Sequence, residues 1–155
     1  MTAILFPTRG GEASYPNQDR AIALAKEREA RLIFMYVADV RFMTLMARPS
    51  VVELEEDIEE LGEFLLAMAQ ERAASQGVKA DMVVRRGMFG DALMDVIEAE
   101  SVDVVVLGVP TGSTGITTPS YRQSVIRDLI AEMGVEVIVV DDGDIVARWT
   151  REKLP

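Results

Sequence analysis

Short apolar runs alternate with longer amphipathic segments along most of this chain. Four apolar runs and one alternating segment predict five strands, at residues 4–6, 32–37, 79–86, 102–107 and 135–140. Apolar residues at three- and four-residue spacing predict four helices, at residues 15–31, 51–76, 91–100 and 121–133. Strands that alternate with helices form right-handed crossovers. We therefore expect an α/β fold, a doubly wound parallel sheet with helices on both faces.

The longest predicted helix, residues 51–76, is also the most acidic segment. Its apolar residues at three- and four-residue spacing are Val51, Leu54, Ile58, Leu61, Leu65 and Met68. Ser50 and Glu53 have the spacing of a capping box before the helix, and Gly77 ends it. The acidic run from Glu53 to Glu63 lacks the ligand spacing of a calcium loop. We interpret it as a solvated face, in a half of the helix where the dipole favours negative charge.

Two of the predicted strands end in loops rich in glycine, at residues 8–11 and 108–115. In doubly wound sheets ligands bind beyond the carboxyl ends of the strands, where the strand order reverses. The second loop leads into a helix, whose free backbone amides favour an anion. The loops fit neither a Walker motif nor a dinucleotide fingerprint. They therefore indicate either a nucleotide crevice or simple turns.

Composition and charge narrow the classes of function. The chain has 155 residues and a net charge of −10, which favours one soluble domain and disfavours binding to nucleic acid or to an anionic membrane. It has no cysteine and no histidine, which excludes disulfides, Ser-His-Asp catalysis and the commonest transition-metal ligands. Without a membrane-length apolar stretch or a signal-peptide pattern, we expect a cytoplasmic protein. We expect one domain at residues 1–143 and a polar tail at residues 144–155.

Several short segments, in a fixed order and spacing, carry a family resemblance. They are Ile4–Thr8 with Glu12–Ser14, Tyr36–Asp39, Gly87 with Asp91, Leu93 and Ile97, Asp103–Gly108, Ser124 with Val125, and Val135–Val140. Together they resemble the universal stress protein family over nearly the whole chain. The resemblance implies a Rossmann-like fold of the adenine nucleotide alpha hydrolase type, with strand order 3-2-1-4-5. It also implies a role in stress tolerance, through nucleotide-dependent signalling or through protein partners.

The same resemblance identifies a nucleotide pocket with altered residues. Where ATP-binding members have an aspartate after the first strand, this chain has Arg9; where they have a glycine before the last serine, it has Gln123. The candidate nucleotide-binding residues are Pro7, Thr8, Arg9, Val37, Gly108, Val109, Gly112, Ser113, Gln123, Ser124 and Val125. Gln123 could crowd a phosphate. Arg9 could bind one, fill the pocket or pair with a carboxylate. The cofactor, if one binds, would be ATP or AMP with Mg²⁺.

The fifth strand is apolar and β-branched and is expected at an edge of the sheet. An uncovered edge of this kind favours pairing with a second chain, and the resemblance implies a homodimer. The candidate contact residues are Val135, Val137 and Val139. The alternative is that the tail folds back over the strand, with Trp149 as its anchor.

A catalytic role has the weakest support in the sequence. Asp39, Asp91, Ser113 and Ser124 lie near strand ends or in the second glycine loop, yet none has an activating partner at recognisable spacing. Phe42 to Met46 are a partner-binding patch, a lid over the crevice, or part of the packing on the long helix. We rank a non-catalytic homodimeric stress or signalling module first. A nucleotide sensor with slow ATP hydrolysis at most comes second, and an enzyme third.

Overall fold

The structure is a computed structural model and describes residues 2–38, 51–109 and 118–155. The elements in chain order are β1 (Ala3–Pro7), η1 (Glu12–Ser14), α1 (Tyr15–Glu27), β2 (Arg31–Ala38), α3 (Val51–Ser75), β3 (Ala80–Arg86), α4 (Phe89–Glu100), β4 (Val104–Gly108), α5 (Pro119–Asp128), η3 (Leu129–Met133), β5 (Glu136–Asp141) and β6 (Asp144–Trp149). The predicted capping box and the Phe42–Met46 segment lie outside the described residues, as do Gly112 and Ser113 of the second glycine loop.

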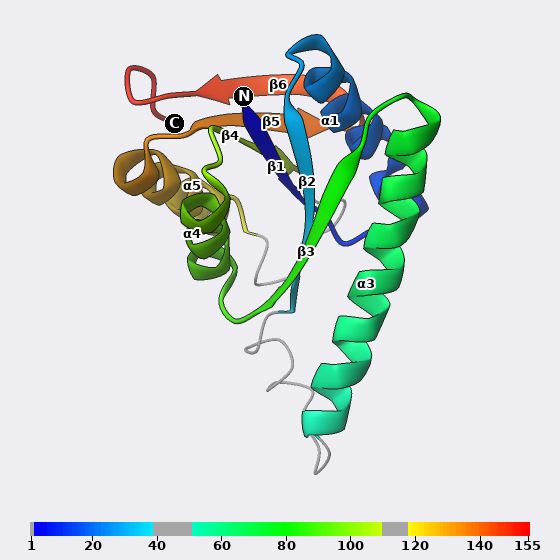
Figure 1. Cartoon of the computed structure of the whole chain (residues 1–155). Helices are drawn as coiled ribbons and strands as arrows, with labels where there is room; N and C mark the ends of the chain where they lie inside the picture. The colour runs from blue at the N-terminus through cyan, green and yellow to red at the C-terminus, as the bar shows by residue number, and fades with distance from the viewer. Residues whose placement is uncertain (1, 39–50, 110–117) are drawn as a thin grey trace.

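Six strands in the described part of the chain form one sheet, in the order β3-β2-β1-β4-β5-β6 (Figure 1). The first five strands are parallel to one another, and β6 is antiparallel to β5. The α/β class and the order 3-2-1-4-5 are therefore confirmed. The count of five strands is wrong, because the segment predicted as a polar tail adds a sixth.

The sheet lies between two helical layers, with α1 and α3 on one face and α4 and α5 on the other (Figure 1). Successive side chains of a strand point to opposite faces. Ile4 and Phe6 accordingly pack under α1 and α3, and Leu5 packs under α4 and α5. Both faces of the central strands are covered, which explains why these strands are continuous apolar runs in the sequence.

The helices α4 and α5 each bury one apolar face against the sheet. In α4 the buried residues are Ala92, Leu93, Val96 and Ile97. In α5 the buried residues are Val125 and Ile126, and the chain continues through the π-helical turn η3 to Gly134, whose φ of 68° ends the helix. Thr118 caps α5 by accepting a hydrogen bond from the Tyr121 backbone N–H, and Pro119 follows at the first helical position.

The helix α3 packs on the sheet through Leu66 and several small residues, and only part of its predicted apolar stripe is covered. Its inner face contains Gly62, Leu66, Ala69 and Ala73, and the last three are at most 1% exposed. Leu61 and Met68, which belong to the predicted stripe, are 51% and 37% exposed. A hydrophobic-periodicity argument gives glycine and alanine little weight. Here, however, they let the helix axis approach the sheet closely.

Two glycines lie at tight contacts of α3 with the rest of the protein. A Cβ atom added at Gly62 would lie 2.5 Å from Cδ1 of Tyr36 on β2. A Cβ atom added at Gly10, in the loop after β1, would lie 2.6 Å from Cβ of Leu65. The N-terminal part of α3 extends past the ends of the strands, beside the edge where ligands bind in such folds (Figure 1).

The C-terminal segment covers the strand that was predicted to be an edge. Register pairs from Val137↔Trp149 to Asp141↔Asp144 join β5 to β6, with a β-bulge between Val139 and Val140. Val135, Val137 and Val139 are all buried, at 3%, 0% and 7% exposure. The prediction of a free β5 edge is therefore wrong, and the alternative of a folded-back tail is confirmed. The physical reason is that β6 supplies the hydrogen-bonding partner that β5 would otherwise lack.

Trp149 is half-buried and packs against the core cluster on the α4 and α5 side. The Lys153 ammonium lies 5.5 Å from the centre of the Trp149 ring. Among the helices that the structure describes, none combines the length and apolar character that a membrane span requires.

Candidate functional site

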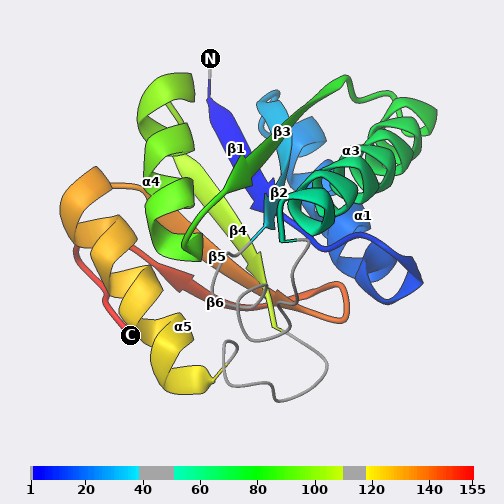
Figure 2. The ribbon, with the colours of Figure 1, turned by 90° about the horizontal axis from the view of Figure 1, so that it is seen from below.

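The candidate site lies at the edge of the sheet where β1 and β4 end. These strands are neighbours, paired at Ile4↔Val104 and Leu5↔Val105, although one hundred residues separate the partners along the chain. From β1 the strand order proceeds to β2 on one side and to β4 on the other, so this is where the order reverses. Figure 2 looks onto this edge from below.

The loop after β1 is held from inside by Thr8, which is 9% exposed. The Thr8 backbone N–H donates to the Met35 carbonyl at 2.8 Å, and Thr8 Oγ1 accepts a hydrogen bond from the Gly10 N–H at 3.1 Å. Gly10 and Gly11 then adopt φ values of 71° and 80°, a region that side chains disfavour. The glycines are thus explained by backbone conformation and by the close approach of Leu65, without a ligand.

Arg9 is exposed at the end of β1 and makes no ion pair among the described residues. Its charge acts on Tyr36, the residue on β2 that packs against Gly62. Burial raises the pKa of the Tyr36 hydroxyl above its ordinary value, and the positive charge of Arg9 opposes this increase. Pro7 and Val37 are half-buried beside these residues, at the ends of β1 and β2.

Gly108 ends β4 against a side chain that the sequence did not single out. A Cβ atom at Gly108 would lie 3.0 Å from Nδ2 of Asn17 on α1. The Asn17 Oδ1 atom accepts a hydrogen bond of 2.8 Å from the Gly143 N–H, in the turn between β5 and β6. Val109 follows, and its N–H donates to the Val140 carbonyl at 2.8 Å. The close contact with Asn17 by itself explains a glycine at position 108, whether or not a ligand binds there.

Gln18, the neighbour of Asn17, is the other site-proximal residue that sequence reasoning missed. It is 1% exposed; its Nε2 donates to Ser14 Oγ at 2.8 Å, and its Oε1 has no hydrogen-bond partner among the described residues. Ser14 Oγ in turn donates to the Gly11 carbonyl at 2.8 Å. The signal available in the sequence was spacing, since Gln18 lies three and four residues before the buried Ala21 and Ile22.

The last three candidate residues, Gln123, Ser124 and Val125, lie in the second turn of α5. Gln123 and Ser124 are exposed, whereas Val125 is 6% exposed and belongs to the core under α4 and α5. The structure therefore brings Arg9, Gly108 and Val109 to one edge, with the two exposed α5 side chains following the loop from β4. It places the Val125 side chain in the core.

The described residues contain no group of three or more acidic side chains arranged to hold a metal ion. Asp91 is exposed in the first turn of α4. A cavity of about 380 Å³ lies away from the candidate site and is lined by Ala3, Arg31, Ala99, Glu100 and Ser101. Arg31 and Glu100 are paired there at 2.6 Å, so their charges are already neutralised.

Residues 1–141 match the model of the universal stress protein family. The chain belongs to this family. Within the family, it is 32% identical over 114 residues to a universal stress protein of Methanocaldococcus jannaschii, and the match covers 73% of this chain. It spans 66% of that relative, slightly less than two thirds of its length.

Solved structures of the family have the same fold at low sequence identity. UspA of Lactobacillus plantarum matches with a TM-score of 0.70 and 19% identity, covering 90% of this chain and 97% of that one. An Archaeoglobus fulgidus member in complex with dAMP gives a TM-score of 0.58 and 15% identity over 90% and 97% of the two chains. An Arabidopsis thaliana member with AMP bound gives 0.55 and 15% over 91% and 92%.

Proposed function

We propose that this universal stress protein is a non-catalytic stress-response module that binds an adenine nucleoside monophosphate. The ligand would lie at the edge formed by the ends of β1 and β4. The observation that carries the proposal is Arg9, an exposed guanidinium without an ion pair among the described residues, placed where the strand order reverses. A guanidinium offers two parallel donors to phosphate oxygens.

The surroundings of Arg9 suit a small anionic ligand. The chain as a whole has a charge of −10, so an anion needs a local positive charge to approach. Gly10 and Gly11 keep the backbone beside Arg9 free of side chains, and Ser124 adds an exposed hydroxyl in the second turn of α5. These groups can bind and orient a phosphate, and no paired base and nucleophile among the described residues supports catalysis.

The choice of a monophosphate depends on Gln123. ATP-binding members have a glycine at this position, and the exposed glutamine side chain would occupy space that a longer phosphate chain needs. The relatives solved with dAMP and AMP support a ligand of this size. ATP with Mg²⁺ is the competing ligand, and it requires the same edge.

The first test is to identify nucleotide that co-purifies with the protein. The protein is denatured and the supernatant is separated by ion exchange, while thermal shifts are measured with AMP, cAMP and ATP, each with and without Mg²⁺. We expect a monophosphate near one per chain, or a rise in melting temperature that is larger for AMP than for ATP. No released nucleotide and no shift at millimolar ligand would rule out the proposed ligand.

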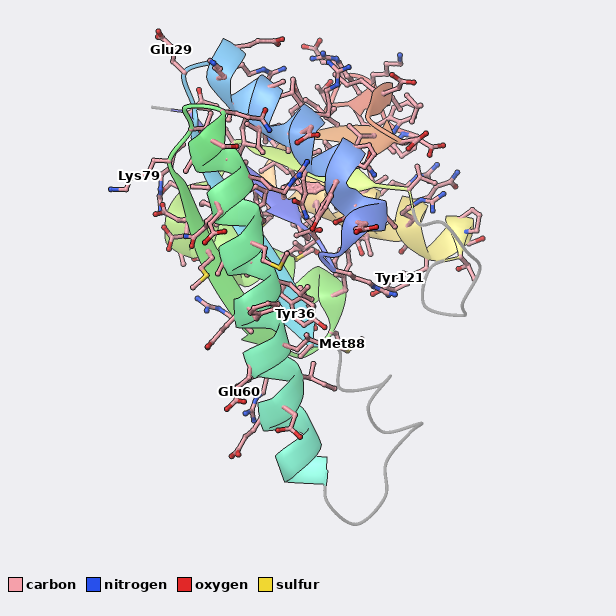
Figure 3. All side chains as sticks on the ribbon, turned by 90° about the vertical axis from the view of Figure 1, so that its right-hand side faces the viewer. Glu29, Tyr36, Glu60, Lys79, Met88 and Tyr121 are labelled. Atoms are coloured by element: carbon pink, nitrogen blue, oxygen red, sulfur yellow. The ribbon has the colours of Figure 1, made fainter. Side chains whose placement is uncertain are left out.

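Variants then assign the site. Arg9→Ala should weaken AMP binding about tenfold, the loss expected for one charge-assisted contact of about 1.5 kcal/mol. Lys79→Ala is the matched control, because Lys79 is an exposed cation just before the first residue of β3 (Figure 3). The candidate site lies at the other, carboxyl-terminal ends of the strands. Arg9→Asp combined with Gln123→Gly restores the residues of ATP-binding members and should shift the preference toward ATP.

A second function is signalling through protein contacts, with or without nucleotide. The predicted homodimer belongs to this alternative, in a changed form. Because β6 covers β5, two copies would have to meet at β6 or on a helical face. Sedimentation equilibrium of the full chain decides between monomer and dimer, and a dimer that Val146→Lys on β6 dissociates would support pairing through that strand.

A further inference from the structure

The outer face of α3 carries a line of large apolar side chains. Leu61, Phe64 and Met68 are 51%, 64% and 37% exposed. Residues three and four apart lie on one side of a helix, so these three form a continuous stripe. The opposite side of α3 packs on the sheet through Gly62, Leu66 and Ala69, so the stripe faces away from the body of the protein.

The stripe is bordered by negative charge. Asp57 and Glu71 continue its line at the two ends, and Glu60 lies four residues before Phe64; all three are exposed. Figure 3 turns α3 toward the viewer and shows Glu60 on its lower half. The sequence of α3 has one basic residue, Arg72, whose Nη2 is bound to Asp19 on α1 at 2.6 Å.

These charges disfavour a second copy of the chain on this face. In an antiparallel pair of α3 helices centred on Phe64, Asp57 of one copy would lie opposite Glu71 of the other, since each is seven residues from Phe64. In a parallel pair each carboxylate would lie opposite the same carboxylate of the second chain. Like charges oppose each other in either arrangement, and an anionic membrane would meet the same repulsion.

We propose that the outer face of α3 is a docking surface for a basic amphipathic helix of another protein. An apolar stripe with carboxylates along it complements a helix that has apolar residues on one side and lysine or arginine beside them. Phe64 is the anchor, because it is the largest and most exposed of the three apolar side chains. The proposal does not depend on nucleotide binding, which concerns the loops at the ends of β1 and β4.

The test uses a fluorescein-labelled peptide of about 18 residues with leucine at helical spacing and lysine or arginine elsewhere, long enough to span the stripe. Its anisotropy is titrated with the full chain. We expect saturable binding that weakens with salt. Phe64→Gln should weaken binding at least about tenfold. Glu60→Gln with Glu71→Gln should weaken it about threefold and reduce its salt dependence.

Matched controls separate a specific groove from general attraction to an acidic protein. Val146→Gln removes an apolar side chain that is 57% exposed on β6, and it should leave the affinity unchanged. A peptide of the same composition with its leucines scrambled off one face should bind at least about tenfold more weakly.

Three results would overturn the proposal. One is equal affinity for the scrambled peptide, or binding that Phe64→Gln does not change. Another is self-association in sedimentation equilibrium that Phe64→Gln abolishes, which would identify a second copy as the occupant. The third is co-sedimentation with phosphatidylserine vesicles that depends on Phe64.

Discussion

The helices α3 and α4 cover opposite faces of one sheet, yet they pack by different rules. In α4 the large apolar residues face the core, as their spacing predicts, and its Gly90 has ordinary room, with the nearest atom to an added Cβ at 3.8 Å. In α3 the large residues Leu61, Phe64 and Met68 are exposed, and the face toward the sheet has Leu66 among small residues, with only 2.5 Å between Tyr36 Cδ1 and a Cβ added at Gly62. The comparison teaches that the spacing of large apolar residues identifies the packed face of a helix only where such side chains fill the space between the helix and the sheet.

The loop that contacts α3 should be the most sensitive point. Gly10→Ala places a side chain at a φ of 71° and brings its Cβ to 2.6 Å from the Cβ of Leu65. The Leu65 Cβ atom cannot rotate away, because its position is fixed by the backbone of α3. The strained conformation costs about 1–2 kcal/mol, and overpacking adds about 1–3 kcal/mol. Urea unfolding should show a loss of about 3 kcal/mol. A loss below about 0.5 kcal/mol would mean that α3 is not held close to this loop.

The same substitution in the two helices should have opposite signs. Gly62→Ala forces a methyl group onto the Tyr36 ring, and we expect a loss of about 1–2 kcal/mol after the gain in helix propensity. Gly90→Ala in α4 meets only Val125 at van der Waals distance and should stabilise by up to about 1 kcal/mol. Thermal unfolding of both variants measures the contrast. Equal effects would contradict the difference in packing.

The contact between α1 and α3 should matter less than the contacts between α3 and the sheet. Arg72 lies over the Tyr15 ring at 4.0 Å and binds Asp19, but these side chains are partly exposed. Arg72→Met retains most of the apolar stem and should lower the free energy of unfolding by about 1 kcal/mol. Asp19→Asn tests the charge alone and should cost about 0.5 kcal/mol. A larger effect for Asp19→Asn than for Arg72→Met would contradict this order.

The outer face of α3 should be nearly neutral for folding. Leu61→Gln and Phe64→Gln remove exposed apolar surface, and each should change stability by at most about 0.5 kcal/mol in either direction. Losses above about 2 kcal/mol in urea unfolding would show that the stripe packs against part of the protein, and would remove the basis for a docking surface.

The smallest expected effect concerns the ion pair that joins β3 to α3. The Arg86 guanidinium donates to Glu59 and lowers the pKa of that carboxyl below its ordinary value of 4.5. A lowered carboxyl pKa stabilises the fold above the ordinary pKa, and this contribution is lost as the pH falls through the lowered value. An NMR titration should show the Glu59 pKa rising in Arg86→Ala. An unchanged pKa would mean that the pair does not persist in solution.

Much of the candidate site followed from the sequence, and part of it did not. The two glycine loops and the arginine at the end of β1 were evident, because glycine and charge are local signals. The roles of Asn17 and Gln18 were not, because each depends on a contact between α1 and a distant turn or loop. The packing of Gly108 against Asn17 could not be predicted from the sequence either, because the Asn17 amide reaches Gly108 only in the folded chain.

By itself the sequence determined the α/β class, the five parallel strands and the helices of the α4 and α5 layer. In those elements the local pattern and the burial agree, because the strands are covered on both faces and the helices bury large side chains. Only the tertiary structure decided which face of α3 packs and what covers β5. The helix face was set by the close approach that Gly62 allows beside the Tyr36 ring. The edge of β5 is covered because the β6 segment of the same chain pairs with its free backbone N–H and C=O groups.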